Sequence, residues 1–312
     1  MDTAIMTGYM NEWNRYKCNL TQMAKHGYNS LIFAHANVHG RYVHMAQELL
    51  NTHTGREILS KGIETAKLCG AKYILITLGS MKDSFKPNGK PEAIARELIN
   101  FLSIYNFNGI NFADSIDIST DYFDELCSWI QRLDSSLLLT ASPLLYQKRN
   151  SPRIHMQTKY NVYLYNVAIY NNRFDYIFLK AYNDPTINVN GYTETDTEFI
   201  SASFKQLKSS IPLRTKIAIG QPSDETGGKF SIFNRKDKKD TIYELIKEQY
   251  ESISGDHQFG GAVVWDVKAD SNNSYRFVEA VKNAIEPMKH IVAGHRRPPY
   301  MFNYSHMKTK VS

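Results

Sequence analysis

Two hydrophobic periodicities alternate along the chain. Short runs of aliphatic, β-branched and aromatic residues are separated by longer segments in which apolar residues recur every three or four positions. The first pattern is typical of buried strands and the second of helices with one apolar face. We predict eight strands, at residues 4–9, 30–35, 73–78, 109–112, 137–140, 176–181, 216–220 and 261–265. We predict helices at residues 56–69, 91–105, 122–133, 197–207, 239–254 and 275–284.

The segment 122–133 shows the helical pattern most clearly. Its apolar stripe consists of Phe123, Leu126, Cys127, Ile130 and Leu133. The opposite face is polar, as expected of a helix that covers a sheet. Pro91 suits the first turn of the helix at 91–105, and Thr120 is the predicted N-cap of the helix at 122–133.

Strands that alternate with helices of this length predict parallel βαβ units. Eight such units in one chain indicate an α/β protein with a single closed (β/α)8 TIM barrel, which we assign to residues 1–286. An open, doubly wound sheet is the alternative, but no G-x-G-x-x-G turn follows the first strand. In a barrel of this kind, binding and chemistry occur where the strands end, so the residues after each run are the candidate site.

Composition and charge narrow the class of protein. The chain of 312 residues has 42% hydrophobic residues, a mean hydropathy of −0.42 and a formal net charge of +6. No apolar run approaches the roughly 18–20 residues that span a bilayer, so no membrane segment is expected. The first residues, Met1 to Ala4, do not resemble a signal peptide. Localisation therefore stays open, with secretion after removal of a signal, or export by another route, as possibilities.

The excess positive charge is concentrated at the C-terminal end. Residues 287–312 contain five Lys or Arg residues and no acidic residue, whereas residues 1–286 carry a formal charge of only +1. This tail also holds Tyr300, Phe302 and Tyr304, so it is too aromatic for a purely solvated linker. Two interpretations are open: the tail packs across the barrel, or it is a docking arm for a protein or an acidic surface. Nucleic-acid binding has no motif to support it.

The sequence contains no motif that supports a cofactor site, a metal site or a serine-hydrolase mechanism. His35, His39 and His44 follow the second strand, but no carboxylate accompanies them, so we expect loop histidines and no metal site. No G-x-S-x-G nucleophile motif is present, and the Gly227-Gly228-Lys229 segment lacks the phosphate-loop spacing. No cofactor is predicted.

The strand ends, taken in order, resemble those of glycoside hydrolase family 18, the chitinases and chitinase-like proteins. The segment from Asn108 to Ser115 resembles the family's D-G-x-D-x-D-x-E strand. The other matching segments are Gly8-Tyr9 with Trp13, Thr77-Leu78-Gly79-Ser80, Thr140-Ala141-Ser142-Pro143, Lys180-Ala181-Tyr182-Asn183-Asp184-Pro185, Ile219-Gly220-Gln221-Pro222 and Gly260 to Trp265. The resemblance covers roughly residues 4–285 and is strongest toward the plant-type and bacterial single-domain branch.

The chain differs from the family motif at every position where the motif has a carboxylate. Aligned without a gap, the aspartate positions hold Asn108, Asn111 and Ala113, and Ser115 stands at the catalytic glutamate. A shift by one residue brings Asp114 to the third aspartate position, but Ile116 then occupies the glutamate position. The resemblance implies substrate-assisted hydrolysis that needs this glutamate as a proton donor. Neither Ser nor Asn donates a proton at neutral pH, so we predict a catalytically inactive member of the family.

The sugar-binding half of the site is better preserved. The resemblance implies that Trp265 lies under a sugar ring and that Tyr182 binds its acetamido group; the alternative for both is a structural role in the barrel. Lys180 departs from the family and could fill the sugar site. The predicted substrate-binding residues are Tyr9, Asn108, Asn111, Tyr182, Asn183, Gln221 and Trp265.

Three functions remain open at this stage. The first is an inactive chitinase-like protein that binds N-acetylglucosamine-containing oligosaccharides. The second is a barrel used as a protein scaffold, enzyme inhibitor or toxin-complex subunit, with a protein as its partner. The third is an active endo-acting chitinase in which Asp114 or Asp117 serves as a relocated acid.

Overall fold

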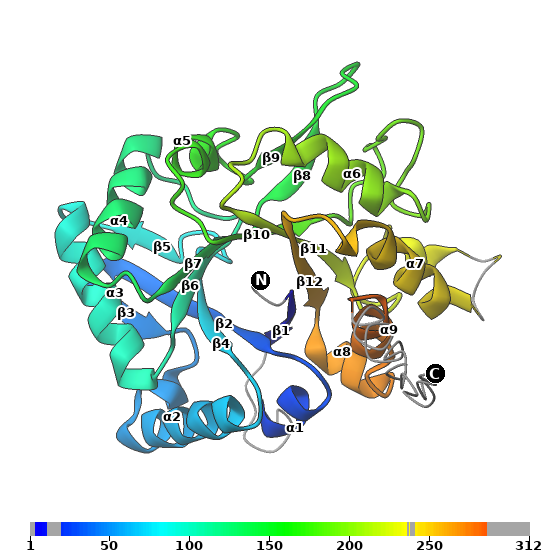
Figure 1. Ribbon diagram of the computed structural model, residues 1–312. Helices are drawn as coiled ribbons and strands as arrows, with labels where there is room; N and C mark the ends of the chain where they lie inside the picture. The colour runs from blue at the N-terminus through cyan, green and yellow to red at the C-terminus, as the bar shows by residue number, and fades with distance from the viewer. Residues whose placement is uncertain (1–3, 11–19, 236, 238–240, 286–312) are drawn as a thin grey trace, which may run out of the picture.

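The computed structural model describes residues 4–10, 20–235, 237 and 241–285. Eight parallel strands surround a central axis and close into a barrel (Figure 1). They are β1 (Ile5–Met10), β2 (Ser30–Gly40), β4 (Tyr73–Leu78), β6 (Gly109–Phe112), β7 (Leu138–Ala141), β10 (Tyr176–Lys180), β11 (Lys216–Pro222) and β12 (Phe259–Trp265). They pair in the order β1-β2-β4-β6-β7-β10-β11-β12, and β12 returns to β1, so the predicted (β/α)8 TIM barrel is confirmed.

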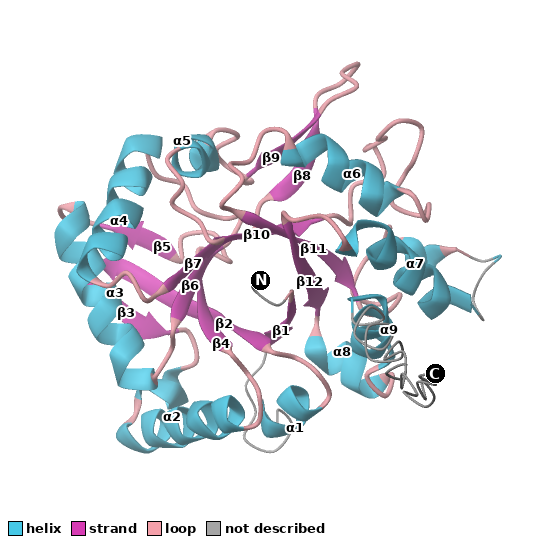
Figure 2. Ribbon diagram, viewed as in Figure 1, coloured by secondary structure: helices cyan, strands magenta, loops and turns pink. Residues whose placement is uncertain are grey.

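Helices form a ring outside the strands (Figure 2). They are α1 (Leu20–Lys25), α2 (His53–Leu68), α3 (Pro91–Tyr105), α4 (Thr120–Leu133), α5 (Leu164–Tyr170), α6 (Phe199–Lys208), α7 (Ile242–Ser254), α8 (Val267–Asn272) and α9 (Arg276–Ile285). Two short 3-10 helices, η1 (Glu48–Asn51) and η2 (Ile232–Asn234), lie in the loops. Within the described residues, no helix combines the length and the apolar character that a bilayer crossing requires.

The predicted helix at 91–105 matches α3 at both ends, with Pro91 in its first turn. At α4 the predicted cap is wrong by one residue. The N-cap is Ser119, whose hydroxyl oxygen accepts from the Tyr122 amide, and Thr120 is the first helical residue. Both Ser and Thr can cap a helix, so the sequence does not show which of the two residues is the N-cap. The path of the chain from β6 into α4 determines it.

Four short strands outside the barrel have no counterpart in the prediction. The strands β3 (Tyr42–Met45) and β5 (Phe85–Pro87) pair with the long extension of β2. The strands β8 (Leu144–Gln147) and β9 (Ile154–Gln157) form an antiparallel hairpin, which joins the barrel through β10. This hairpin and α5 lie between β7 and β10, so this βα unit is larger than the sequence pattern indicates.

The barrel buries two apolar layers because successive strand residues point to opposite faces. The inner cluster contains Ile5, Tyr9, Ile32, Leu75, Leu138, Tyr176, Phe178, Ala218 and Val263. The outer cluster lies between the strands and the helices and includes the predicted stripe of α4. Side chains at the inner positions nearest the carboxyl ends of the strands are therefore the ones that face the barrel mouth.

The division between barrel and tail stays a prediction. The described part of the barrel reaches Ile285, and the predicted tail at 287–312 lies outside the described residues. Of the cysteines, Cys127 is buried and Cys69 is partly exposed, and both are free thiols.

Candidate functional site

A pocket of about 550 Å³ opens at the carboxyl ends of the barrel strands. Five of the predicted site residues line it: Tyr9, Asp114, Tyr182, Asn183 and Trp265. They come from the ends of β1, β6, β10 and β12, which are distant in sequence and whose carboxyl ends all lie at the same end of the barrel. The structure therefore brings together most of the residues that the motifs single out.

Tyr9 and Trp265 form the aromatic part of this pocket. Their ring centroids lie 5.3 Å apart with a tilt of 58°, which is an ordinary geometry for a packed aromatic pair. Tyr9 is buried, and burial raises the pKa of its phenol above the ordinary value. Trp265 is only half-buried, so one part of the indole is accessible from the pocket. The Trp265–Asp266 peptide bond is cis.

Beneath these rings, Asn111 is at the centre of a closed hydrogen-bond cycle. Its Nδ2 donates to the Tyr9 hydroxyl at 3.0 Å, and its Oδ1 accepts from Ser142 Oγ at 2.8 Å and Thr140 Oγ1 at 2.9 Å. The Tyr9 hydroxyl, which is 2.5 Å from Ser142 Oγ, then completes the cycle by donating to it. Asn111 is fully buried, so it supports the pocket from below and does not line it.

The amide of Asn111 supplies both the donor and the acceptor that this cycle uses. A carboxylate there could accept from Ser142 and Thr140, but it would have no proton to donate to Tyr9. The asparagine that stands at the family's aspartate position therefore fits the hydroxyl groups around it. The pocket floor contains no negative charge at this position.

Asp114 is the one carboxylate among the described residues that line the pocket. Its Oδ2 lies 2.9 Å from Lys180 Nζ, and its Oδ1 lies 3.5 Å from Lys159 Nζ. The Lys159 backbone amide also donates to the Asp114 carbonyl at 2.7 Å. Because the Asp114 side chain is almost fully buried, these two lysines supply its principal charge compensation.

Lys180 stands at a position where the chain differs from the family motif. Its ammonium group lies 5.9 Å from the Trp265 ring centroid, within the range of a cation–π contact. Lys180 therefore lines the pocket and joins Asp114 to the aromatic wall.

The position of the family glutamate offers no acid. Ser115, in the ungapped alignment, is buried, and its one hydroxyl proton is shared between the Ser80 carbonyl at 3.3 Å and Asp114 Oδ1 at 3.2 Å. Ile116, in the shifted alignment, packs against Gly79, where an added Cβ would come within 2.1 Å of Ile116 Cγ1. Asp117 is exposed on the loop before α4 and does not line the pocket.

Tyr182 and Asn183 form the wall after β10. Tyr182 is half-buried, and burial raises the pKa of its hydroxyl above the ordinary value. Asn183 adopts a left-handed backbone with φ of 74°, which asparagine tolerates better than most residues. Its Oδ1 accepts from the Lys229 amide at 2.6 Å, so this side chain connects the wall to the loop after β11.

Besides Asn111, two predicted binding residues do not line this pocket. Asn108 precedes β6 at the amino end of the barrel, where it accepts from the Ile74 amide and donates to the Lys72 carbonyl. Gln221 points outward from β11 and donates to Gln249 of α7 at 2.9 Å. The sequence motif gives the order of residues along a strand, but it does not give the end or the face on which each one lies.

Sequence reasoning missed several pocket residues. Thr77 and Ser80 have buried hydroxyl oxygens without a hydrogen-bond partner, and both line the pocket. His35, which we expected in a solvated loop, is half-buried there, and desolvation lowers its pKa. Thr77 and Ser80 are part of a quoted motif and could have been found from it. Lys159 follows the β8–β9 hairpin, for which the periodicity gave no signal.

Glu194 lies behind the pocket wall in the loop after β10. Its Oε1 accepts from the Asp184 amide at 2.8 Å, while its buried Oε2 has no partner. Desolvation by burial raises the pKa of this carboxyl group to about 7. Within the described part of the chain, no cluster of three or more His, Cys, Asp or Glu side chains is arranged to hold a metal ion.

Comparison with known proteins supports the resemblance read from the strand ends. No protein-family model matches the chain. Endochitinase A1 of Aspergillus fumigatus is 26% identical over 108 residues, which are 34% of this chain and 12% of the fungal protein. The acidic endochitinase of Phaseolus angularis is 26% identical over 222 residues, which are 67% of this chain and 66% of the plant protein.

Solved structures with the same fold include enzymes and proteins of other kinds. A family 18 chitinase from Chromobacterium violaceum superposes with a TM-score of 0.69 at 14% identity, covering 91% of this chain and 83% of that one. A xylanase and α-amylase inhibitor protein from Scadoxus multiflorus gives 0.61 at 15% identity, covering 91% and 98%. The tamarind chitinase-like lectin gives 0.57 at 17% identity, covering 88% and 98%. At these identities the likeness establishes the fold.

The barrel and the pocket at its carboxyl face define a (β/α)8 protein whose fold is similar to that of chitinases. The resemblance to glycoside hydrolase family 18 is confirmed, since the curated relatives are endochitinases and the structures with the same fold are family 18 chitinases and chitinase-like proteins.

Proposed function

We propose that the pocket at the barrel mouth binds N-acetylglucosamine-containing oligosaccharides without hydrolysing them. One observation carries this proposal. Asp114, the one carboxylate among the described pocket residues, is bound by Lys180 and Lys159, and Ser115 stands where the family has its proton donor.

Hydrolysis of a glycosidic bond needs a carboxylic acid that protonates the leaving oxygen. Such general acid catalysis contributes about 10²- to 10⁴-fold to the rate. A carboxylate that accepts a hydrogen bond from one ammonium group and forms an ion pair with a second is an acceptor and has no proton to give. Asp114 in this arrangement fixes Lys180 at the pocket wall and does not act as the acid.

Sugar binding does not need a proton donor. It needs an apolar face and hydrogen-bonding groups, and the pocket contains both. The accessible part of Trp265 offers an apolar face to the C–H side of a pyranose ring, and Tyr182 offers a hydroxyl group beside it. The unpartnered hydroxyl groups of Thr77 and Ser80 gain partners if a ligand's polar atoms enter the pocket. The endochitinase relatives and the chitinase-like lectin with the same fold support a sugar as ligand.

The experiment is a calorimetric titration of the full chain with chitotetraose, together with a fluorogenic chitooligosaccharide assay from pH 4 to 8. The proposal predicts saturable binding and no turnover. Asp114→Asn and Asp117→Asn serve as controls in the assay. Turnover that disappears in either variant would identify a relocated acid and an active chitinase, and absence of any binding would exclude the sugar-binding function.

A second candidate is a scaffold or inhibitor whose ligand is a protein. It is favoured by Lys180, which lies over the Trp265 ring and takes space that a sugar would need. Xylanase and α-amylase inhibitor proteins share the fold. Titration of a xylanase and an α-amylase with the full chain tests it: inhibition in the absence of chitotetraose binding supports this function, and no effect on either enzyme excludes inhibition of these two classes.

A further inference from the structure

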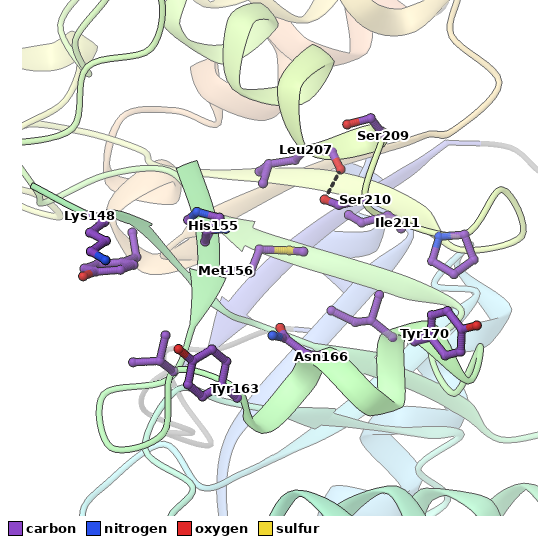
Figure 3. A pocket seen from close by; sticks show the side chains of 14 residues that line it. Lys148, His155, Met156, Tyr163, Asn166, Tyr170, Leu207, Ser209, Ser210 and Ile211 are labelled. Carbon is purple, nitrogen blue, oxygen red and sulfur yellow. Dashed lines mark hydrogen bonds between the residues drawn. The ribbon is translucent and has the colours of Figure 1, made fainter. Parts of the chain in front are cut away.

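A second cavity lies on the outside of the barrel, away from the barrel mouth. It has a volume of about 710 Å³ and is bounded by the β8–β9 hairpin, α5 and the segment that follows α6 (Figure 3). We call it the α5 groove and define it by Tyr146, Lys148, His155, Tyr163, Asn166 and Tyr170. None of its lining residues belongs to the pocket at the barrel mouth. Its volume is in the range of small-ligand sites.

The wall contributed by α5 presents an aromatic, an amide and a second aromatic side chain in sequence. Tyr163, Asn166 and Tyr170 are spaced at i, i+3 and i+7, which places them on one side of the helix. The two tyrosines are therefore about 10 Å apart along the helix axis. Both rings are unusually open, with 69% of Tyr163 and 82% of Tyr170 exposed. Figure 3 shows them at the two ends of the groove with Asn166 between them.

The polar groups of the groove are available for a ligand. The Asn166 amide and the tyrosine hydroxyl groups make no side-chain hydrogen bond within the described structure. Ser210 donates from Oγ to the Leu207 carbonyl and can still accept. Buried aliphatic side chains, among them Met156, form the floor. Flat aromatic faces combined with amide and hydroxyl groups suit a sugar ring, which has an apolar C–H face and a rim of hydroxyls.

The surroundings of the groove carry an excess of basic side chains. Residues 135–174 contain five Lys or Arg residues and no Asp or Glu, and two of the five, Lys159 and Arg173, are paired with Asp114 and Asp124. Lys148, Arg149 and Arg153 are exposed on the β8–β9 hairpin, and in the described structure none of them has a carboxylate partner. The residues that line the groove include Lys148 and His155 and no acid. A ligand with negative charge is therefore electrostatically favoured at this surface.

We propose that the α5 groove is a second carbohydrate site, specific for an oligosaccharide that carries carboxylate groups. The pyranose rings stack on Tyr163 and Tyr170, Asn166 binds hydroxyl groups between them, and the carboxylates face the basic β8–β9 hairpin. The site is independent of the pocket at the barrel mouth, so it does not require the function proposed for that pocket.

The probe is tetragalacturonic acid, and its fully methyl-esterified form is the matched control, because it keeps the sugar rings and removes the charge. Calorimetric titration of the full chain at low ionic strength is expected to show binding of the acid and much weaker binding of the ester. Added salt weakens the interaction because exposed charges are screened. Equal affinity for acid and ester would overturn the charge specificity, and no binding of the acid would overturn the site.

Single substitutions show which site of the protein binds tetragalacturonic acid. Tyr170→Ala and Tyr163→Ala are each expected to weaken the affinity for tetragalacturonic acid about five- to tenfold. Tyr42→Ala, at an exposed tyrosine of β3, and Trp265→Ala, at the barrel mouth, are expected to leave it unchanged. Loss of affinity in Trp265→Ala would instead place the acid in the barrel pocket. A copolymer of glutamate and tyrosine tests the competing ligand class: if it binds through Tyr170 and the sugar does not, the groove is a peptide site and the proposal is wrong.

Discussion

The ammonium group of Lys180 lies 2.9 Å from Oδ2 of Asp114, 66 positions earlier in the chain. The pair joins the end of β10 to the turn after β6, across the mouth of the barrel. It pairs the one carboxylate among the described pocket residues with a cation that lies beside the Trp265 ring.

The two members of the pair are expected to differ in their contribution to stability. Lys180→Gln leaves a buried carboxylate with only the more distant Lys159, so it should lower the free energy of unfolding by about 2–4 kcal/mol. Asp114→Asn leaves Lys180, which is partly exposed and can turn toward water, so about 1–2 kcal/mol is expected. Urea unfolding of both variants and of the double variant measures the difference. Equal losses would show that Asp114 is not the more deeply buried charge.

Asn111→Asp is expected to be strongly destabilising, although it restores the residue type of the family motif. The carboxylate would be fully buried, would lose the donation to Tyr9 and would have no cationic partner in the cycle, so a loss of about 3 kcal/mol or more is expected. The matched control is Asn108→Asp, which restores the other aspartate position at a half-buried place. Thermal and urea unfolding should show the larger effect at position 111; the reverse order would refute the role assigned to the cycle.

Trp265→Ala is expected to weaken chitotetraose binding at least about tenfold, because the apolar face for the sugar ring is lost. Trp129→Ala on α4, far from the pocket, is the control for a general effect of removing a tryptophan. Calorimetric titration measures both. Unchanged affinity in Trp265→Ala would mean that the indole only closes the barrel, which is the structural alternative.

Glu194 gives the protein a pH dependence near neutrality. Its pKa is about 7 in the folded chain against an ordinary value of 4.5, so the folded state holds the proton more tightly than the unfolded state. Stability from this group is therefore fully present below pH 4.5 and is lost as the pH rises to 7, by up to about 3 kcal/mol. Urea unfolding at pH 4.5 and 7.5 should show this loss in the wild type and much less of it in Glu194→Gln.

Glu251→Gln, at an exposed position on α7, is the control for that comparison and should retain the pH dependence of the wild type. Because Glu194 accepts from the Asp184 amide, its ionisation should also affect the wall that carries Tyr182. An identical pH profile in the wild type and in Glu194→Gln would show that the carboxyl group titrates in its ordinary range.

Much of the fold follows from local sequence pattern. The eight runs of strand residues and the helices between them were predictable because each element buries one face, and that face repeats with the period of the element. The β8–β9 hairpin and α5 were not predicted. The hairpin strands are only four residues long and α5 only seven, and periodicity over so few positions is weak.

The residue types of the candidate site could be predicted from the sequence, but the places of their side chains in the barrel could be predicted only in part. Tyr9, Tyr182 and Trp265 were recognised because each follows an apolar run and matches a family motif. Gln221 and Asn108 do not line the pocket, and a motif does not state which side chains face the barrel axis or which end of the barrel they occupy. Gln221 occupies an outward position of β11, and Asn108 lies at the amino end of β6.

The sequence by itself determined the barrel, the order of its strands and the residue types at the strand ends, because these depend on periodicity and on the identity of single residues. Only the tertiary structure decided that Lys180 and Lys159 meet at Asp114, that an asparagine completes the cycle under Tyr9, and that the tyrosines of α5 face a basic hairpin. These arrangements join residues far apart in the chain. Their geometry is set by the closure of the barrel and by burial, which no local pattern of residues records.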